Sequence, residues 1–351
     1  MSEHGEIVLA DGTSDPALER RVRDTRRRGG LGWFAFRRCL TGLGTMVFVL
    51  LFNFVLFQLL PGDPAARYRG VRDVSSEALA QLREELNAPV WEQFVTYIKD
   101  PLSLDAISTQ YGEPVWDVIR DNFWATVVLL GTATFVATVV GVWIGIRAGW
   151  SRGSKFDKGS TGVTLLLYAT PEFWLGLILI MLFSSGVGPF PALFPSGTIK
   201  DAGVDALSIE GVISIAYHTV LPATALALVY LADYSLIMRA SMVDELGQDY
   251  LTTARAKGLM DFRIRRRHAV PNASLPTITL IFLNFGFIIG GAITVETVFS
   301  YPGLGLLSVE AIDAQDLPLL QALFLFASAA VIAFNIVADI LIAVVDPRIR
   351  V

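Results

Sequence analysis

The sequence predicts an all-α membrane protein that crosses the bilayer six times and carries a small extracytoplasmic domain after its first span. Three observations support this fold class. Of the 351 residues, 53% are hydrophobic and only 17% are charged. Six apolar stretches are long enough to span, since crossing the hydrocarbon layer takes about 20 mainly apolar helical residues. Basic residues also alternate between successive loops, as they do in multi-pass proteins.

The six stretches each satisfy the length requirement for a transmembrane helix. They cover residues 40–60, 123–146, 161–186, 217–237, 275–295 and 319–345. An even number of spans places both termini on one side of the membrane. The N-terminal tail ahead of the first span is rich in arginine and contains no apolar run, so we expect a solvated segment and no secretory signal peptide.

The distribution of Lys and Arg predicts which side each loop faces, because these residues stay preferentially in the cytoplasm. Of the 28 basic residues, 21 lie in the tail, the loops 147–160 and 238–274 and the C-terminus, and seven lie in the other loops. Both termini and these two loops are therefore predicted to be cytoplasmic. The predicted organisation is a tail (1–35), a first span (36–60), an extracytoplasmic domain (61–122), a core with five spans (123–346) and a cytoplasmic C-terminus (347–351).

Composition argues against several kinds of enzyme. Cys39 is the only cysteine, the only histidines are His4, His218 and His268, and no His-Glu-x-x-His motif occurs, so an intramembrane enzyme or metal centre is disfavoured. The Gly-x-x-x-x-Gly-Lys-Ser/Thr phosphate loop is missing too, because residues 153–160 lack the glycine before Lys158. We expect no cofactor on this chain and no nucleic-acid partner.

A short helix is predicted in the loop 238–274, over residues 250–257, and Gly258 should end it because glycine readily adopts the left-handed conformation that closes helices. A helix of about two turns is marginal alone in water, so it requires a partner surface. Tyr250, Ala254 and Lys257 share one face by their spacing, and the small Ala254 would permit close approach of that partner.

This loop resembles the coupling loop of ABC importer permeases, in which a glycine precedes an Ile-x-Leu-Pro sequence at a fixed distance. Gly258 and Pro271 are in register with that pattern, whereas Thr252 and His268 replace its Glu and Ile. The run from Ala254 to Leu259 followed by Arg-His-Ala is similar to the variant found in dipeptide, oligopeptide and nickel permeases. The candidate coupling residues are Asp249, Tyr250, Thr253, Ala254, Arg255, Ala256, Lys257, Gly258, Leu259, His268, Pro271 and Asn272.

Other segments resemble the same branch, and in combination and order they are specific. They are the sequences at residues 60–64, 296–306, 316–318 and 346–348. One departure lies at residues 104–108, where the family's Asp-Leu-Gly-x-Ser lacks its glycine.

The resemblance implies a type I ABC importer permease fold in a bacterial cytoplasmic membrane. It also implies a second homologous permease, two ATPase subunits that hold ATP and magnesium, and an extracytoplasmic substrate-binding lipoprotein. The expected function is to form half of a translocation pathway for dipeptides or oligopeptides. Alternatives are import of nickel or another small solute, and, from another class, an ion-coupled secondary transporter, which would depend on an ion gradient instead of ATP.

Acidic side chains inside spans are candidates for the pathway, because burying them in lipid is costly. The candidates are Glu172 and Asp233, which lie inside predicted spans, and Glu296, which directly follows the fifth. Glu172 follows Pro171 near mid-depth of the third stretch, where its carboxylate either faces a peptide amino terminus or accepts hydrogen bonds from backbone freed by the proline. For Asp233 and Asp339, near the cytoplasmic ends of their spans, structural pairing is favoured.

Two further patterns predict packing and membrane contact. Gly141, Gly145 and Gly149 have the four-residue spacing that lets helices approach closely, either within the subunit or across a permease pair. The basic run 265–267 is expected to anchor its loop at the lipid surface by positive charge.

Overall fold

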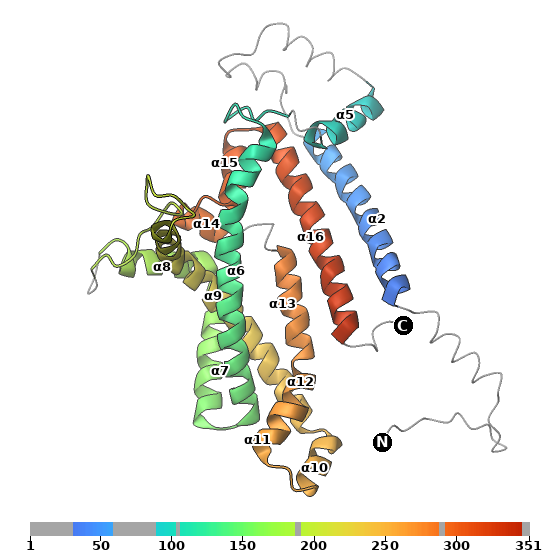
Figure 1. Ribbon diagram of the computed structural model, residues 1–351, viewed down its shortest axis with the longest axis vertical. Helices are drawn as coiled ribbons and strands as arrows, with labels where there is room; N and C mark the ends of the chain where they lie inside the picture. Colours follow the sequence, from blue (N-terminus) through green and yellow to red (C-terminus); the bar gives the residue numbers. More distant parts are fainter. Residues whose placement is uncertain (1–30, 59–88, 103–105, 187–190, 288–291, 346–351) are drawn as a thin grey trace, which may run out of the picture.

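The computed structural model describes residues 31–58, 89–102, 106–186, 191–287 and 292–345. Apart from an isolated antiparallel bridge between Ile107 and Pro114, the regular elements in these ranges are helices (Figure 1). In chain order they are α2 (Leu31–Gln58), α5 (Val90–Leu102), α6 (Val115–Trp150), α7 (Lys155–Tyr168), α8 (Glu172–Phe183), α9 (Ile209–Leu246), α10 (Asp249–Ala256), α11 (Asp261–Ile264), the π-helical turn η2 (Arg265–Ala269), α12 (Val270–Ala273), α13 (Leu275–Phe287), α14 (Ile293–Phe299), α15 (Leu304–Asp313) and α16 (Leu317–Val345).

Four of these helices are long and apolar enough to cross a membrane: α2, α6, α9 and α16. They cover the first, second, fourth and sixth stretches predicted from the sequence, with mean hydropathies between 1.8 and 2.2. The all-helical membrane architecture is therefore confirmed. The tail up to residue 30, the end of the predicted first span with the first part of the predicted outer domain (59–88), and the last six residues lie outside the described part of the chain.

The third predicted stretch, 161–186, is not one helix. α7 and α8 meet at an angle of 100°, with Pro171 as the N-cap of α8. Proline cannot donate a backbone hydrogen bond and disfavours a helical conformation at the residue before it, so the helix ends at this point. The pair forms either one bent span or a re-entrant segment, and Glu172 begins its second half.

The fifth predicted stretch, 275–295, is only partly described. α13 has 13 residues, which at 1.5 Å per residue extend about 20 Å, short of the hydrocarbon thickness. Residues 288–291 lie outside the described ranges, and α14 follows them. The described helices thus supply four spans, or five if α7 and α8 count as one.

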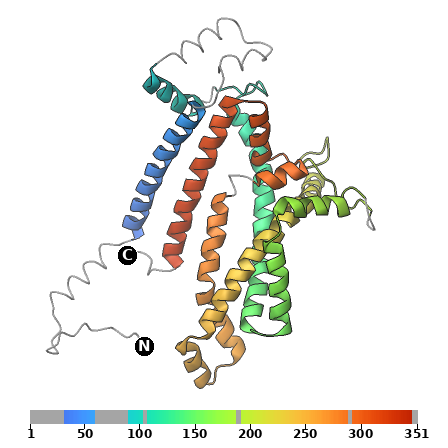
Figure 2. The same ribbon diagram turned by 180° about the vertical axis from the view of Figure 1, so that it is seen from behind.

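The centre of the subunit is the contact between α6 and α9, seen from behind in Figure 2. A Cβ atom added at Gly141 would lie 2.8 Å from the carbonyl oxygen of Leu231. Added at Gly145 or Gly149, it would lie 2.6 Å from Met238 Cβ or 2.5 Å from Met242 Cβ. Glycine at these three positions is what permits the close approach, so the stripe packs the helices within one subunit.

At the opposite end of α6 from the loop 147–160, a buried polar clasp joins residues 106–114 to the start of α16. Asp316 is fully buried, and its carboxylate accepts hydrogen bonds from the Ser108 hydroxyl at 2.5 Å and the Gln110 backbone N–H at 3.0 Å. It also accepts from the Leu319 backbone N–H at 3.1 Å and so caps α16. Ser108, the last residue of the stretch that departs from the family pattern, therefore meets the family-like segment 316–318 here.

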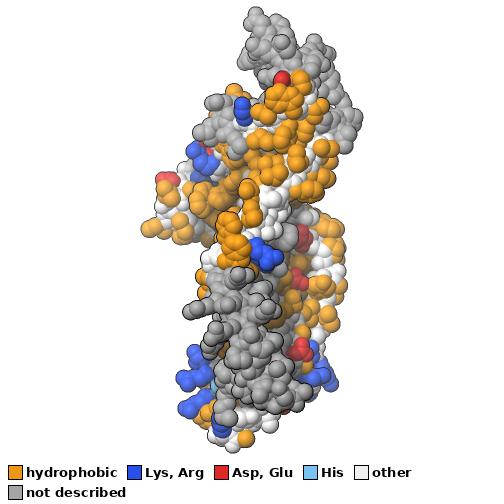
Figure 3. Space-filling model, turned by 90° about the vertical axis from the view of Figure 1, so that its right-hand side faces the viewer, with side chains coloured by type: hydrophobic (Ala, Val, Ile, Leu, Met, Phe, Trp, Pro, Cys, Tyr) orange, Lys and Arg blue, Asp and Glu red, His pale blue; other side chains and the backbone are white. Residues whose placement is uncertain are grey.

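α2 lies on the outside of the bundle and packs mainly on α16 (Figure 2). Arg38 and Asp339 connect the two helices through a 3.1 Å ion pair, which confirms the structural pairing expected for Asp339. Over the upper half of the described surface in Figure 3, hydrophobic side chains predominate, and blue Lys and Arg side chains gather at the lower end. A surface divided in this way fits lipid around the bundle and water at its end.

Candidate functional site

The candidate coupling loop folds into a compact module below α9, built from α10, α11, η2 and α12 (Figure 1). α10 covers eight residues, and Gly258 follows it with φ of +76°, where its N–H donates to the Arg255 carbonyl at 2.9 Å. The short helix and its glycine end are therefore confirmed. Nothing lies within 4 Å of a Cβ built on Gly258, so a larger side chain there would project into open space.

The inner face of α10 packs into a small apolar cluster of its own. Leu251 and Ala254 are 0% and 7% exposed, and they pack with Met238 and Met242 of α9 and Ile264 of α11. The i, i+4 and i+7 spacing predicts that Ala254 faces a partner protein, whereas the structure buries it within the subunit. Ala254 packs against its own subunit, where α11 contacts α10.

A polar clasp around Tyr250 holds the module to the helices on either side. The Tyr250 hydroxyl lies beside the Glu245 carboxylate at the end of α9, 3.2 Å from the His268 carbonyl oxygen, and accepts from the Asn272 amide at 2.9 Å. Burial and the Glu245 carboxylate raise the pKa of this hydroxyl, so it stays protonated at neutral pH and acts as a donor. Three of the predicted residues, Tyr250, His268 and Asn272, thus meet.

The outer face of the module is exposed and carries most of the remaining predicted residues. Its exposed members from the prediction are Asp249, Thr253, Arg255, Ala256, Lys257, Gly258 and Pro271, whereas Leu259 packs against the apolar cluster. Arg255 lies 3.7 Å from the Asp261 carboxylate in an exposed ion pair. Lys257 and the Arg255–Asp261 pair therefore flank the glycine turn.

Sequence reasoning missed two apolar side chains at the tip of this module. Met260 and Phe262 are 62% and 58% exposed, on either side of Asp261. Exposed large apolar groups among charges are typical of surfaces that another protein covers. The available signal was a pair of apolar residues in an otherwise polar loop, just beyond the predicted helix.

Glu172 and Asp233, two of the candidate pathway acids, lie in the neighbourhood of Tyr230 on α9. Both are partly exposed, and within the described ranges neither has a hydrogen-bond or ion-pair partner. The Tyr230 and Tyr234 rings lie 6.5 Å apart with a tilt of 38°, and the Tyr234 hydroxyl accepts from the Asn284 amide at 3.0 Å. α8, α9 and α13 therefore bring acids, phenols and an amide to one region.

Glu296, the third candidate acid, has a different setting. Its side chain is fully buried, and one carboxylate oxygen accepts from the backbone N–H groups of Gly305 at 2.7 Å and Leu306 at 3.1 Å. The other oxygen accepts from Thr126 of α6 at 2.9 Å. The carboxylate thus lies at the N-terminus of α15, where negative charge is favoured. A Cβ added at Gly303 would lie 2.5 Å from it, which explains the glycine.

The fold and this module define a class of protein, a helical membrane subunit that exposes a braced helical turn at one end. Within its described residues there is no group of His, Cys, Asp and Glu side chains that could hold a metal ion. Comparison with known proteins gives the family. Residues 141–351 match the model of the binding-protein-dependent transport system inner membrane component, and residues 32–130 match its N-terminal companion.

Relatives match almost the whole chain. It is 36% identical to the dipeptide transport system permease protein DppB of Escherichia coli K12 over 340 residues, which cover 90% of this chain and 98% of the relative. The oligopeptide transport system permease protein AppB of Bacillus subtilis is 33% identical, with 90% and 99% covered. The di/tripeptide permease DppB of Pseudomonas aeruginosa is 35% identical, with 90% and 98% covered.

The chain belongs to the family of binding-protein-dependent transport system inner membrane components. It is a non-catalytic permease subunit of an ABC transporter, located in the inner membrane. The resemblance stated from the coupling loop and the flanking motifs is thereby confirmed.

Proposed function

We propose that this chain forms half of the pathway of an ATP-driven importer for short peptides. It spans the bacterial cytoplasmic membrane six times, with both termini cytoplasmic, an outer domain over 61–122 and the loop 238–274 facing the ATPases. Its partners are a second homologous permease, two ATPase subunits that hold ATP and magnesium, and an extracytoplasmic substrate-binding lipoprotein. The observation that carries the proposal is the braced, exposed module at α10 and α11.

The module suits a mechanical connection because it is anchored inside and open outside. Motion of a partner pressed against Lys257, Met260 and Phe262 passes to α9 through the apolar cluster, and to α12 through the Tyr250 clasp. An exposed helix of eight residues would bend under load without these contacts. The proposed docking surface is therefore the outer face, with the inner face transmitting the movement.

Short peptides are the proposed substrates for two reasons. The relatives are named for dipeptide, di/tripeptide and oligopeptide transport. In addition, Glu172 and Asp233 near Tyr230 offer negative charge to the amino terminus that every unblocked peptide carries. Glu296 takes no part in this route in our proposal, because its carboxylate is committed to the N-terminus of α15.

Docking is tested by replacing Gly258 with leucine in the complete complex. The side chain would meet nothing in this subunit, and the left-handed backbone costs only about 1 kcal/mol. Gly203→Leu is the matched control, because Gly203 has φ of +80° and equally open surroundings in the α8–α9 connection. We expect the amount of ATPase subunit that co-purifies with the permease to fall at least tenfold in Gly258→Leu and to stay unchanged in Gly203→Leu. Equal amounts of ATPase in both variants would refute docking at this turn.

The substrate class is tested in vesicles that contain the wild-type complex and its binding protein. ATP should drive uptake of a free dipeptide, and N-acetylation should reduce it because the positive amino terminus is lost. Uptake driven by an imposed ion gradient without ATP would instead support a secondary transporter, and equal uptake of free and acetylated peptide would remove the role given to Glu172 and Asp233.

A further inference from the structure

A pocket of about 540 Å³ opens where α6 meets the coupling module. Its walls come from the last turns of α6, the α6–α7 turn, the first turn of α7 and the first residue of η2. The lining residues are Trp143, Ile146, Arg147, Trp150, Ser151, Ser154, Phe156 and Arg265. Two guanidinium groups, two hydroxyls and aromatic rings thus share one cavity, and neither the coupling nor the pathway proposal uses them.

The two arginines are held by rings and not by acids. The Arg147 guanidinium carbon lies 4.7 Å from the centre of the Phe156 ring and 5.6 Å from that of Trp143. The Arg265 guanidinium carbon lies 5.8 Å from the centre of the Trp150 ring. Within the described ranges, no carboxylate lies within ion-pair distance of either arginine. Cation–π contacts leave the N–H groups of a guanidinium available for an anion.

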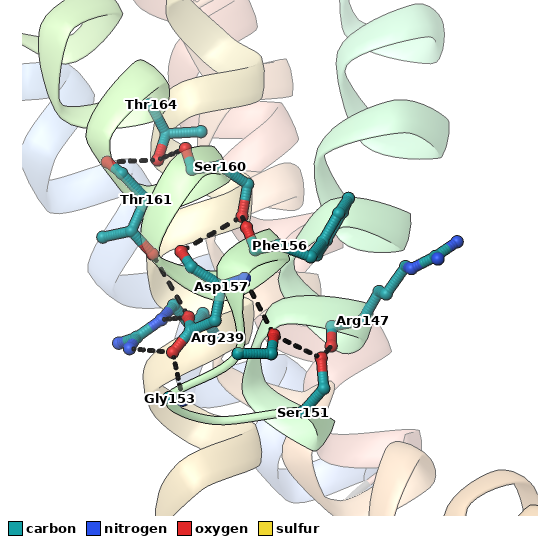
Figure 4. A network of polar contacts seen from close by, with 10 residues as sticks. Arg147, Ser151, Gly153, Phe156, Asp157, Ser160, Thr161, Thr164 and Arg239 are labelled. Atoms are coloured by element: carbon teal, nitrogen blue, oxygen red, sulfur yellow. Dashed lines mark hydrogen bonds and ion pairs between the residues drawn. The ribbon is translucent and has the colours of Figure 1, made fainter.

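The acid closest to this pocket in sequence, Asp157, is already neutralised. Its carboxylate accepts from Arg239 of α9 at 2.5 and 3.0 Å and from the Gly153 N–H at 2.8 Å. Figure 4 shows Arg147 pointing away from this network, on the opposite side from Arg239. The Asp157 charge therefore belongs to the contact between α7 and α9, and the pocket keeps a positive balance.

An exposed apolar stripe leads along α6 to the pocket. Phe135, Val139 and Trp143 are 71%, 55% and 54% exposed, and their four-residue spacing continues to Arg147. Tryptophan at the level of lipid headgroups, followed by arginine, is the usual order of residues where a transmembrane helix leaves the bilayer. The stripe would lie along acyl chains while the pocket lies at headgroup depth.

We propose that this pocket binds the phosphate-bearing headgroup of an anionic phospholipid in the cytoplasmic leaflet, with Arg147 and Arg265 on the phosphate oxygens. Guanidinium groups bind phosphate through paired hydrogen bonds, and basic pockets between membrane helices hold such headgroups. Because Arg265 belongs to η2, the lipid connects α6 to the coupling module. The inference needs the cytoplasmic orientation proposed above, but not docking of an ATPase.

The test uses the intact detergent-purified complex and phosphatidylglycerol, with bound lipid counted by native mass spectrometry. Arg147→Gln with Arg265→Gln should weaken phosphatidylglycerol binding at least tenfold, since each arginine near the surface contributes about a fivefold effect. Arg152→Gln with Arg266→Gln removes the same charge from exposed neighbours that do not line the pocket, and should bind like the wild type. Arg147→Lys with Arg265→Lys keeps the charge but not the paired donors, so its binding should lie between that of the glutamine variant and that of the wild type.

Three results would overturn the proposal. The first is an equal loss in both glutamine variants, which would show that surface charge alone attracts the lipid. The second is displacement of the lipid by glycerol 1-phosphate or inorganic phosphate at equal concentration, which would identify a free phosphate as the ligand. The third is loss of the second permease from the Arg147→Gln, Arg265→Gln complex, which would make the pocket part of the interface between permeases.

Discussion

The two ends of this subunit differ in how far their charged side chains are buried. At the end that holds α15, the carboxylates of Glu296 and Asp316 are fully buried, and each accepts several hydrogen bonds from its own subunit. At the end that holds α10, Arg255 and Lys257 lie exposed around the glycine turn, although Asp157 near this end is buried and paired with Arg239.

The difference separates two reasons for a polar residue in a membrane protein. A buried carboxylate with all its partners fixes the relative positions of helices, because leaving its partners unpaired is costly. Exposed cations around a braced turn contribute little to the fold and remain available to a partner. The end that holds α15 is thus rigid, whereas the end that holds α10 presents an exposed surface on a rigid base.

The largest effect is expected for Glu296→Ala. Two backbone N–H groups and the Thr126 hydroxyl lose their acceptor, and unsatisfied buried donors cost ~1–3 kcal/mol each, so the free energy of unfolding should fall by ~4 kcal/mol. Thermal unfolding of the purified complex, followed by fluorescence-detected size exclusion, measures this. Glu310→Ala removes only an exposed acceptor of Tyr111 and should cost less than ~1 kcal/mol.

Glu296→Gln sharpens the comparison, because the amide keeps one acceptor oxygen and the shape of the side chain. We expect it to retain more stability than Glu296→Ala and to transport normally once folded. A stable Glu296→Gln complex that no longer transports peptide would contradict a purely structural role and return Glu296 to the translocation route.

A smaller, local effect is expected for Ala254→Asp. The new carboxylate would enter the apolar cluster of Leu251, Met242 and Ile264, and burying an unpaired polar group costs ~3 kcal/mol or more. The loss is limited to the stability of the module, so insertion should persist while proteolysis near Gly258 accelerates. Ala256→Asp adds the same charge on the exposed side of α10. Equal protease resistance in the two variants would show that Ala254 does not face inward.

The sequence predicted the helical spans and the coupling helix well, because both depend on local signals. Long apolar runs predict α2, α6, α9 and α16, and Gly258 ends α10 as expected. The third stretch was harder, since its hydropathy is continuous across residues 161–186 while the chain turns by 100° before Glu172. Pro171 was visible, but a proline alone does not distinguish a kink from a sharp turn.

The features that could not be predicted from the sequence depend on tertiary contacts. Helical spacing placed Tyr250 and Ala254 on one face, but it could not show that this face folds onto α9 and α11. Likewise, the sequence could not distinguish Glu296 from Glu172, because each is an acid beside apolar residues. The backbone N–H groups that Glu296 accepts from lie nine and ten residues later, and only the turn through Gly303 brings them near.

The smallest effect is expected for Tyr250→Phe, which removes one hydroxyl from the clasp. Its loss deprives the Asn272 amide of an acceptor and the Glu245 carboxylate of a donor, and a hydrogen bond of this kind contributes ~1 kcal/mol. Because α10 keeps its apolar cluster, we expect the module to stay folded but to transmit motion less faithfully. ATP hydrolysis should continue while peptide uptake per ATP falls by a few fold.

Tyr168→Phe is the control for this last variant, because the Tyr168 side chain is 61% exposed and its hydroxyl has no hydrogen-bond partner in the described part of the chain. If Tyr250→Phe lowers hydrolysis and uptake equally, the clasp acts on docking. If Tyr250→Phe changes neither hydrolysis nor uptake, the apolar cluster alone connects α10 to α9. The end that holds α10 would then depend on packing, where the end that holds α15 depends on hydrogen bonds.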